Sequence, residues 1–379
     1  MSLLFEPFQI KSINIRNRTV RSATYEGMGT HAGAPSKQLA KLYNTLAEGQ
    51  VGLLVTSATL IERFKISLPE DENLAYPTFI DSDAMIALWR PIVKDVHARG
   101  AAIAMQVVHP GRQENPMLRG GEPPIAPSAV EEKAFGNMPR AMSVGEIEEM
   151  VEKFAQVCRR VKEAGLDAVQ LHGGHGYLLS NFISPYTNRR TDEYGGDTRR
   201  RAKIIVDIVR RARELVGEDY PIMIKMNCSD FVPDGLTKDE AARVAAVIAD
   251  AGIDCIEITG GIYETREEMS RKGINKQEKE TYFRPYAEAL RNTVKVPLIL
   301  VGGVRTPKVA ERVLSDGIAD MISFSRPFIR EPQLIKRWKE GDLRKATCIS
   351  CNQCSDNVFT QPMRCYVEEA KRAKREKNL

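Results

Sequence analysis

The sequence predicts an α/β protein and, within that class, a (β/α)8 barrel, in which eight parallel strands alternate with eight helices. Eight short apolar runs recur along the 379 residues, and each run is followed by a longer stretch with helical periodicity. The runs are rich in apolar residues and do not alternate strictly, as is typical of parallel strands covered by helices on one face and packed side chains on the other. Eight units in this order favour the barrel over a doubly wound sheet.

The elements follow from local signals in the order in which they occur. Ser143 and Glu146 form a capping box ahead of one helix, and Thr237 with Glu240 repeats it. Thr306 is expected to cap a third helix, ahead of a first-turn proline. The expected strands are residues 18–25, 51–61, 101–109, 167–174, 221–230, 254–261, 297–304 and 320–328.

The chain is expected to divide near residue 340. Residues 1–340 carry the barrel pattern, whereas residues 341–379 hold a cysteine cluster and a charged tail, EEAKRAKREKNL, that is expected to form a solvated helix. Two long excursions, residues 110–142 and 181–201, interrupt the barrel pattern. Loops of this length in a compact domain usually serve as lids or binding loops.

The composition indicates a soluble globular protein. Hydrophobic residues make up 42% of the chain and charged residues 28%, and the net charge of +5 gives no global field for nucleic acid or membrane. The longest apolar runs are too short to span a bilayer, and MSLLFEPFQIKS lacks the features of a signal peptide. We therefore expect a cytoplasmic protein without nucleic-acid or membrane partners, and a homo-oligomer is left open.

Functional residues of a (β/α)8 barrel gather at the C-terminal ends of its strands. Two neighbouring strand ends suggest a phosphate site, because Gly302 and Gly303 precede a helix N-terminus and Ser325 and Arg326 close the next strand. Exposed backbone N–H groups and helix dipoles favour an anion at such a corner, and an arginine adds a charged fork. The alternative is a pair of turn glycines beside a surface arginine.

Gln106 and Lys225 are polar residues inside otherwise apolar strands, and buried polar groups need partners. A flavin would satisfy both, since the Gln106 amide can bind the pyrimidine edge and Lys225 can stabilise negative charge near N1 and the C2 carbonyl of the reduced ring. A structural ion pair is the competing interpretation for Lys225.

The stretch QLHGGHGY places His172, His175 and Tyr177 at the end of the fourth expected strand, in a chain with five histidines. A catalytic zinc site would require a third ligand, and none has a convincing spacing. The two imidazoles can instead donate N–H bonds to a carbonyl or nitro oxygen, and Tyr177 can act as a general acid. A purely structural role for the histidines is the remaining alternative.

With these residues in place, the sequence resembles the old yellow enzyme family of FMN-dependent ene-reductases over nearly the whole chain to about residue 340. The matching blocks are NRTVRSA, HPGR, HGGHGYLLSNFISPYTNRRTDEYGG, VGG and SRPF. The resemblance implies that NAD(P)H reduces FMN, and that the flavin passes hydride to an alkene conjugated to a carbonyl or nitro group, such as an enone or enoyl substrate. It also implies that His172 and His175 bind the activating oxygen and that Tyr177 is the proton donor. The residues that it implies for the FMN site are Ala23, Thr24, Tyr25, Ala58, Gln106, Lys225, Gly302, Gly303, Ser325 and Arg326.

Two of these positions depart from the family pattern. Tyr25 aligns where many members have threonine or cysteine beside the flavin, and Lys225 replaces the commoner arginine. Lysine keeps the positive charge but loses the two-pronged geometry of a guanidinium group.

Four of the seven cysteines, namely Cys348, Cys351, Cys354 and Cys365, are clustered near the C-terminus. This clustering suggests metal more than disulfides. The cluster resembles that of the multidomain 2,4-dienoyl-CoA reductases and trimethylamine dehydrogenase, which implies a [4Fe–4S] cluster and electron exchange with a partner. Zinc and free thiols remain alternatives, because four thiolates suit either metal.

Four functions therefore remain open, and an FMN ene-reductase leads them. A redox subunit of the dienoyl-CoA reductase or amine dehydrogenase type is the second. A flavin-storing or redox-sensing protein and a metal-dependent barrel hydrolase are the others, and the hydrolase would require His172 and His175 to bind metal.

Overall fold

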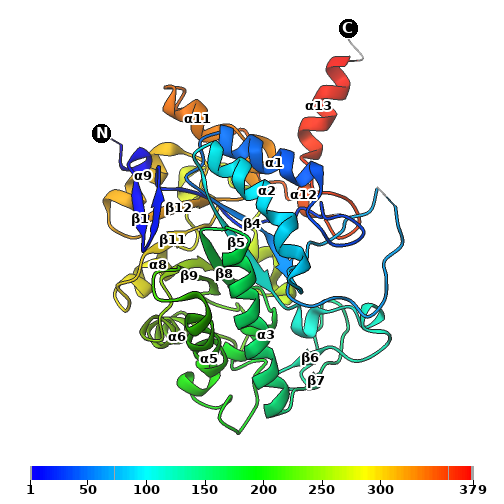
Figure 1. Cartoon of the computed structure of the whole chain (residues 1–379). Helices are drawn as coiled ribbons and strands as arrows, with labels where there is room; N and C mark the ends of the chain where they lie inside the picture. Colours follow the sequence, from blue (N-terminus) through cyan, green and yellow to red (C-terminus); the bar gives the residue numbers. More distant parts are fainter. Residues whose placement is uncertain (1, 72, 357, 377–379) are drawn as a thin grey trace.

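Eight apolar runs form eight parallel strands that close into a barrel, which confirms the predicted (β/α)8 fold (Figure 1). The computed structural model describes residues 2–71, 73–356 and 358–376. The barrel strands follow one another in chain order: β3 (Thr19–Arg21), β4 (Leu53–Leu60), β5 (Ala102–Val108), β8 (Ala168–Gly173), β9 (Ile222–Asn227), β10 (Cys255–Thr259), β11 (Leu298–Leu300) and β12 (Met321–Phe324). Each lies inside its expected range, and β12 pairs with β3 to close the cylinder.

Helices surround the barrel, as the periodic stretches predict. They include α1 (Lys37–Glu48), α2 (Ala84–Ala98), α3 (Val144–Glu163), α5 (Thr198–Val216), α6 (Lys238–Asp250), α8 (Arg284–Arg291), α9 (Pro307–Ser315) and α11 (Leu334–Lys339), with the short helices α4 (Leu178–Ile183), α7 (Arg266–Met269) and α10 (Arg326–Arg330) between them. The capping box of α3 is present, and Thr237 caps α6.

Thr306 is the N-cap residue of α9 and Pro307 begins the helix, as expected, but the Thr306 side chain makes no capping hydrogen bond. The Thr306 hydroxyl donates to Glu280 Oε1 at 2.5 Å instead of accepting from its own helix. Glu280 Oε2 accepts from the backbone N–H groups of Arg305 (2.8 Å) and Thr306 (3.0 Å). A buried carboxylate from a distant loop therefore satisfies donors where α9 begins, a long-range solution that local sequence signals do not reveal.

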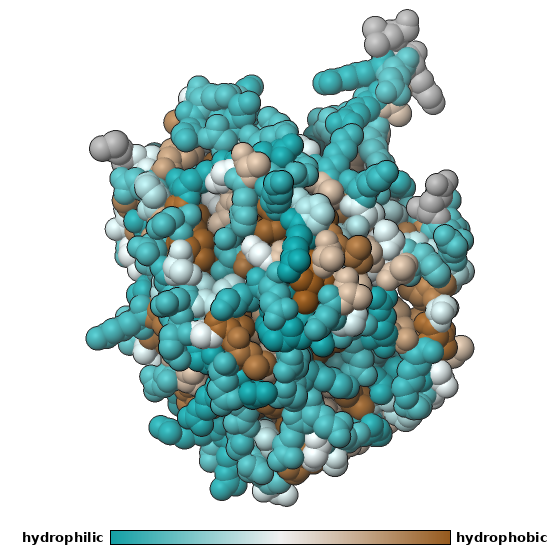
Figure 2. Space-filling model, in the orientation of Figure 1, coloured by the Kyte–Doolittle hydropathy of each residue, from teal (hydrophilic) through white to brown (hydrophobic). Residues whose placement is uncertain are grey.

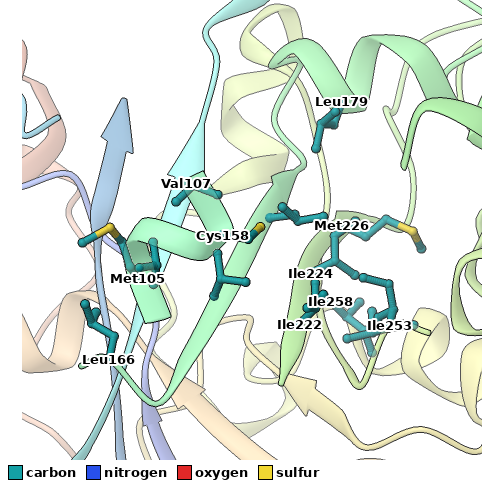
Figure 3. Packing of buried hydrophobic residues seen from close by; sticks show 14 of the residues in the cluster. Met105, Val107, Cys158, Leu166, Leu179, Ile222, Ile224, Met226, Ile253 and Ile258 are labelled. Atoms are coloured by element: carbon teal, nitrogen blue, oxygen red, sulfur yellow. The ribbon is translucent and has the colours of Figure 1, made fainter. Parts of the chain in front are cut away.

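The core has two parts. Apolar residues between the strands and the outer helices form the larger part, and Figure 3 shows a section of it with Met105, Cys158 and Ile224. Inside the barrel, the hairpin of β1 (Phe8–Ile10) and β2 (Ile13–Ile15) contributes Ile10, Ile13 and Ile15 to a second cluster with inward strand residues such as Val20 and Leu53. The barrel interior is therefore filled at the end opposite the strand C-termini.

Three segments build over the C-terminal ends of the strands. The excursion at 110–142 contains η2 (Gly111–Gln113), η3 (Pro116–Arg119), β6 (Ile125–Ala126) and β7 (Arg140–Ala141). The loop after β10 contains η4 (Tyr263–Thr265). The C-terminal extension returns to the barrel, since Ala346 N donates to Arg305 O and Met363 N donates to Glu26 O, both at 2.8 Å.

The expected tail helix is α13 (Tyr366–Glu376), which projects from the body of the barrel (Figure 1). Its last turns are exposed, and residues 377–379 of the expected helix lie outside the described range. Figure 2 shows mainly hydrophilic residues on the face that it presents. Among the described helices, none combines the length and apolarity that crossing a bilayer requires.

Candidate active site

A cavity of about 250 Å³ lies at the C-terminal mouth of the barrel. It is lined by all the predicted catalytic and cofactor-binding residues except Gly302, that is, by Ala23, Thr24, Tyr25, Ala58, Gln106, His172, His175, Tyr177, Lys225, Gly303, Ser325 and Arg326. Gly302 instead packs its backbone against Phe283, where an added Cβ would lie 3.1 Å from the ring at a φ of +130°. Its backbone conformation therefore explains this glycine without a ligand contact.

The floor of the cavity is a buried polar network centred on Glu257, a residue that the sequence analysis missed. Strand register places Lys225 between His172 and Glu257. The Lys225 ammonium donates to Ser22 Oγ at 2.6 Å and lies 3.3 Å from Glu257 Oε1. The structural ion pair considered for Lys225 is thus present. The sequence signal for Glu257 was a single carboxylate inside the apolar strand CIEIT.

Glu257 collects further donors, and Gln106 joins the same network. Glu257 Oε1 accepts from Ser22 Oγ (2.7 Å) and Ser323 Oγ (2.9 Å), and Oε2 accepts from Gln170 Nε2 (2.9 Å). Gln106 Nε2 donates to Gln170 Oε1 at 2.8 Å. Burial raises the pKa of Glu257, but Lys225 and these hydrogen bonds outweigh it, and the net pKa lies below the usual value. The network therefore holds a charged pair at the base of the cavity.

The two histidines and Tyr177 lie together on the wall. The ring centroids of His172 and His175 are 5.1 Å apart, and those of His172 and Tyr177 are 4.8 Å apart. His172 Nδ1 accepts from Gly174 N at 3.3 Å, so the proton of the neutral ring resides on Nε2. Burial lowers the pKa of His172 well below its usual value and that of His175 to about 3, so both imidazoles are neutral near pH 7.

His175 sits in an unusual backbone conformation with a φ of +61°. Its N–H donates to Asn227 Oδ1 at 3.0 Å, and its ring Nε2 lies 2.8 Å from Thr259 Oγ1. Both the backbone and the ring of His175 are therefore held in place by neighbouring side chains. In the part of the chain that the structure describes, no group of three or more His, Cys, Asp or Glu side chains has the geometry to hold a metal ion.

A second tyrosine, which the sequence analysis also missed, contacts Tyr177. The two hydroxyl oxygens of Tyr177 and Tyr263 are 3.4 Å apart. Burial raises the pKa of Tyr177, and the hydrogen bond from Tyr263 lowers it in part. Tyr263 follows the GG pair at the end of β10, and its neighbour Glu264 forms a buried ion pair with Arg112 at 2.6 Å. The excursion after β5 thus fixes the loop that carries Tyr263.

Of the predicted phosphate corner, Gly303, Ser325 and Arg326 line the cavity and Gly302 does not, while Thr24 lies beside Ser325. The hydroxyls of Thr24 and Ser325 lie 3.0 Å apart. The Arg326 guanidinium donates to Arg271 O at 2.8 Å and to Asn352 Oδ1, and among the described residues no carboxylate pairs with it. A half-buried cation with only neutral partners among the described residues fits an anionic ligand such as a phosphate.

The four clustered cysteines surround a second, small cavity of about 20 Å³, and Arg326 borders both cavities. All seven cysteines are free thiols. The pKa of Cys354 is raised to about 12, mainly by burial and in smaller part by the other three thiols of the cluster, while Arg326 lowers it in part. The four cysteines therefore line one small cavity, although the described side chains do not have the geometry of a formed metal site.

Comparisons with known proteins identify the family of the chain. The model of the NADH:flavin oxidoreductase / NADH oxidase family matches residues 3–344. The NADH oxidase of Thermoanaerobacter brockii is 36% identical over 352 residues, which is 92% of this chain and 52% of that protein, and the NADPH dehydrogenase of Geobacillus sp. (strain WCH70) is 32% identical over 333 residues, 87% of this chain and 92% of that protein.

Solved structures also resemble this chain. The old yellow enzyme homologue from Zymomonas mobilis superimposes with a TM-score of 0.75 at 26% identity, covering 94% of this chain and 98% of that one. The chain spans about half the length of some curated relatives, 52% in the case of the Thermoanaerobacter protein. With a barrel, a mouth cavity and a family model that all coincide, the chain belongs to the NADH:flavin oxidoreductase / NADH oxidase family.

Proposed function

We propose that the protein is an FMN-dependent NAD(P)H oxidoreductase that reduces the C=C bond of α,β-unsaturated carbonyl compounds or related activated alkenes. The observation that carries this proposal is the position of His172, His175 and Tyr177 on one wall of a cavity with Lys225 on its floor. FMN supplies hydride, which it receives from NAD(P)H, when it is bound. The chain supplies orientation, electrostatics and a proton.

The cofactor site is proposed to use the cavity residues around the floor and the phosphate corner. Arg326 lacks a carboxylate partner among the described residues and suits the phosphate, and Lys225 suits the electron-rich edge of the ring system. The proposed contacts are Ala23, Thr24, Tyr25, Ala58, Gln106, Lys225, Gly303, Ser325 and Arg326.

The histidines are proposed to bind the activating oxygen of the substrate. The Nε2–H of neutral His172 is free to donate into the cavity, because its Nδ1 accepts from Gly174 N. A neutral donor stabilises negative charge on an oxygen without giving up its proton to it. Tyr177 then donates its hydroxyl proton to the α-carbon. Lys225 and Glu257, the charged groups at the base of the cavity, take no part in this proton transfer.

We infer that the cysteine cluster is a site for a [4Fe–4S] cluster, and that electron exchange with a partner protein is a second candidate function. The support is the convergence of Cys348, Cys351, Cys354 and Cys365 on one small cavity. A Cys351→Ser variant should lose iron and acid-labile sulfide while keeping its flavin. Stoichiometric zinc in the wild-type protein, or no metal after anaerobic purification, would remove this function.

The other proposals concern context. Seven free thiols support a cytoplasmic location, because a reducing compartment keeps thiols free. We also propose that residues 1–340 form the catalytic barrel and residues 341–379 an extension that completes its mouth.

The half-reactions test the proposed chemistry separately. Protein purified without air should carry FMN absorption that bleaches with NAD(P)H and returns on adding an enone. Tyr177→Phe should slow the return by 10²-fold or more, the ordinary contribution of a positioned acid on the order of 10² to 10⁴, and leave bleaching nearly unchanged. Equal loss in both half-reactions would remove Tyr177 from the proton-donor role, and colourless protein with zinc at the histidines would end the proposal.

A further inference from the structure

A second large cavity opens from the active-site cavity toward the surface, and we name it the outer chamber. Its volume is about 580 Å³, within the range of ligand pockets. It shares four lining residues with the active-site cavity, and neither His172 nor His175 lies on its wall. The shared residues are Tyr25, Ala58, Tyr177 and Tyr263.

Apolar side chains from three separate segments form the wall of the outer chamber. Strand β4 and the loop after it contribute one side, β5 and the excursion after it a second, and the C-terminal extension a third. The principal apolar lining residues are Leu60, Phe64, Leu68, Leu74, Val108, Leu118, Phe135 and Phe359.

Backbone hydrogen bonds tie these segments together. Lys65 N donates to Leu118 O at 2.8 Å, and Ala75 N donates to Thr360 O at 3.3 Å. At the base, Leu60 and Val108 pack with Phe79 in a cluster that Tyr177 also contacts. Connected loops therefore form the wall of the outer chamber, which extends outward from Tyr177, the proposed proton donor.

Several polar groups on the wall are engaged by the protein itself, and among the described residues the buried Gln113 Oε1 is an acceptor without a hydrogen-bond partner. Gln113 Nε2 donates to His175 O at 2.7 Å, and Glu114 pairs with Arg119 at 2.8 Å. Asn115 Oδ1 accepts from Met117 N at 3.0 Å. With these groups occupied, the surface that the chamber offers a ligand is mainly hydrocarbon and aromatic ring.

Aromatic rings form the junction between the outer chamber and the surface. Tyr263 lies with its ring centroid 5.0 Å from that of Phe135 and 6.3 Å from that of Phe359, and Phe359 lies 5.6 Å from Tyr25. The side chains of Phe135 and Phe359 are 49% and 54% exposed. Exposed aromatic residues at the mouth of an apolar cavity mark a place where a ligand removes them from water.

We propose that the outer chamber binds an apolar chain or ring that the substrate carries on the alkene side of its activating group, away from the carbonyl carbon. This inference rests on the proposed function, because it takes the carbonyl to lie at the histidines. The chamber meets the active-site cavity at Tyr177 and Tyr263 and not at the histidines, so its entrance lies on the alkene side of a substrate whose carbonyl oxygen is bound by His172 and His175. The substrate class is therefore a hydrophobic enal or enone with a long or bulky alkene substituent.

Two substrate series with matched carbon numbers test the proposal on the FMN-saturated protein. In trans-2-alkenals the added chain lies on the alkene, whereas in alkyl vinyl ketones it lies on the carbonyl carbon. For the alkenals, each buried methylene should raise kcat/KM about fourfold until the chamber is full. The ketones should show little dependence on length. Equal dependence in both series, or none in the alkenals, would overturn the proposal.

Variants locate the effect in the chamber. Leu118→Trp and Leu68→Trp add bulk from two different walls, and each should remove most of the gain of long alkenals while changing kcat/KM of the shortest alkenal less than about twofold. Met117→Trp is the matched control, because Met117 neighbours Leu118 but is 69% exposed and outside the lining. A control variant that behaves like Leu118→Trp would contradict the assigned location.

A binding measurement separates this proposal from the proposed function. Calorimetry with unreactive straight-chain alkanamides should show affinity that rises with chain length in the wild type and not in Leu118→Trp, with flavin content and melting temperature matched. If no alkenal reoxidises the reduced flavin yet the amides bind in this way, the chemistry fails and the chamber stands. If short alkenals react and neither series depends on length, the chamber assignment fails and the chemistry stands.

Discussion

The buried ion pair of Lys225 and Glu257 beneath the cavity should contribute strongly to the free energy of unfolding. The variant Glu257→Gln tests this. Lys225 and Glu257 are 5% and 0% exposed, with 3.3 Å between Nζ and Oε1. At an effective dielectric constant of about 20, two unit charges at that distance attract by about 5 kcal/mol. Removing one partner of a buried pair commonly costs about 3 to 5 kcal/mol, because the remaining charge is left uncompensated.

The two partners should differ, because their remaining contacts differ. Without its carboxylate partner, the Lys225 ammonium retains Ser22 Oγ as its hydrogen-bond acceptor. Without Lys225, Glu257 still accepts from Ser22, Ser323 and Gln170. We therefore expect Glu257→Gln to cost about 3 to 5 kcal/mol and Lys225→Met about 2 to 3 kcal/mol.

Urea unfolding of flavin-free protein measures these costs without a contribution from cofactor affinity. The double variant should be more stable than the sum of the single losses predicts, by about 2 kcal/mol. Two results would refute the reasoning: a loss below about 1 kcal/mol for Glu257→Gln, or strict additivity of the two substitutions. Either result would mean that the remaining charge is stabilised by water that enters the site or by rearrangement of the surrounding protein.

Three shorter predictions follow from other contacts. Tyr263→Phe removes the hydrogen bond that lowers the pKa of Tyr177, so alkene reduction should slow and the alkaline limb of its pH profile should move to higher pH, as stopped-flow rates across pH would show. Because the pKa of Glu257 is lowered in the folded protein, its stabilisation is present above the ordinary glutamate value of about 4.3 and is lost as pH falls through the lower folded value; Glu257→Gln should flatten that acid limb in unfolding experiments. Ser143→Ala should cost about 1 kcal/mol by opening the capping box of α3, whereas Ser315→Ala, at the other end of a barrel helix, should cost less in the same thermal melts.

The barrel was predictable because its signals are local. Continuous apolar runs such as LLVTSATL and IMIKMN lie on both sides of capped helices, and strand order in this fold repeats chain order. The rule that places function at strand ends then brought His172 and Lys225 to one cavity from distant parts of the chain. The alternation of apolar runs and helical stretches thus predicted the fold and which strand ends form the cavity.

The other features of the fold and the site depend on contacts between distant residues, which local sequence patterns do not predict. Glu257 could be noticed as a charge in an apolar strand, but its four donors lie on or just after other barrel strands, and the sequence does not show which of them meet it. Tyr263 and the Glu280 carboxylate near α9 act across loops whose paths the sequence leaves undefined. Gly302 was assigned to a ligand, although a positive φ against Phe283 is sufficient to explain it.

The C-terminal extension has a consequence for how such enzymes diversify. Ser350, Cys354, Val358 and Met363 line the active-site cavity, and Phe359 and Thr360 line the outer chamber, yet none of them belongs to a barrel strand. A segment attached after the last strand therefore helps to shape both cavities, while residues on and just after the barrel strands supply the floor beneath the active-site cavity. Chimeras at this junction offer a route to new substrate preferences in which the catalytic barrel is inherited unchanged.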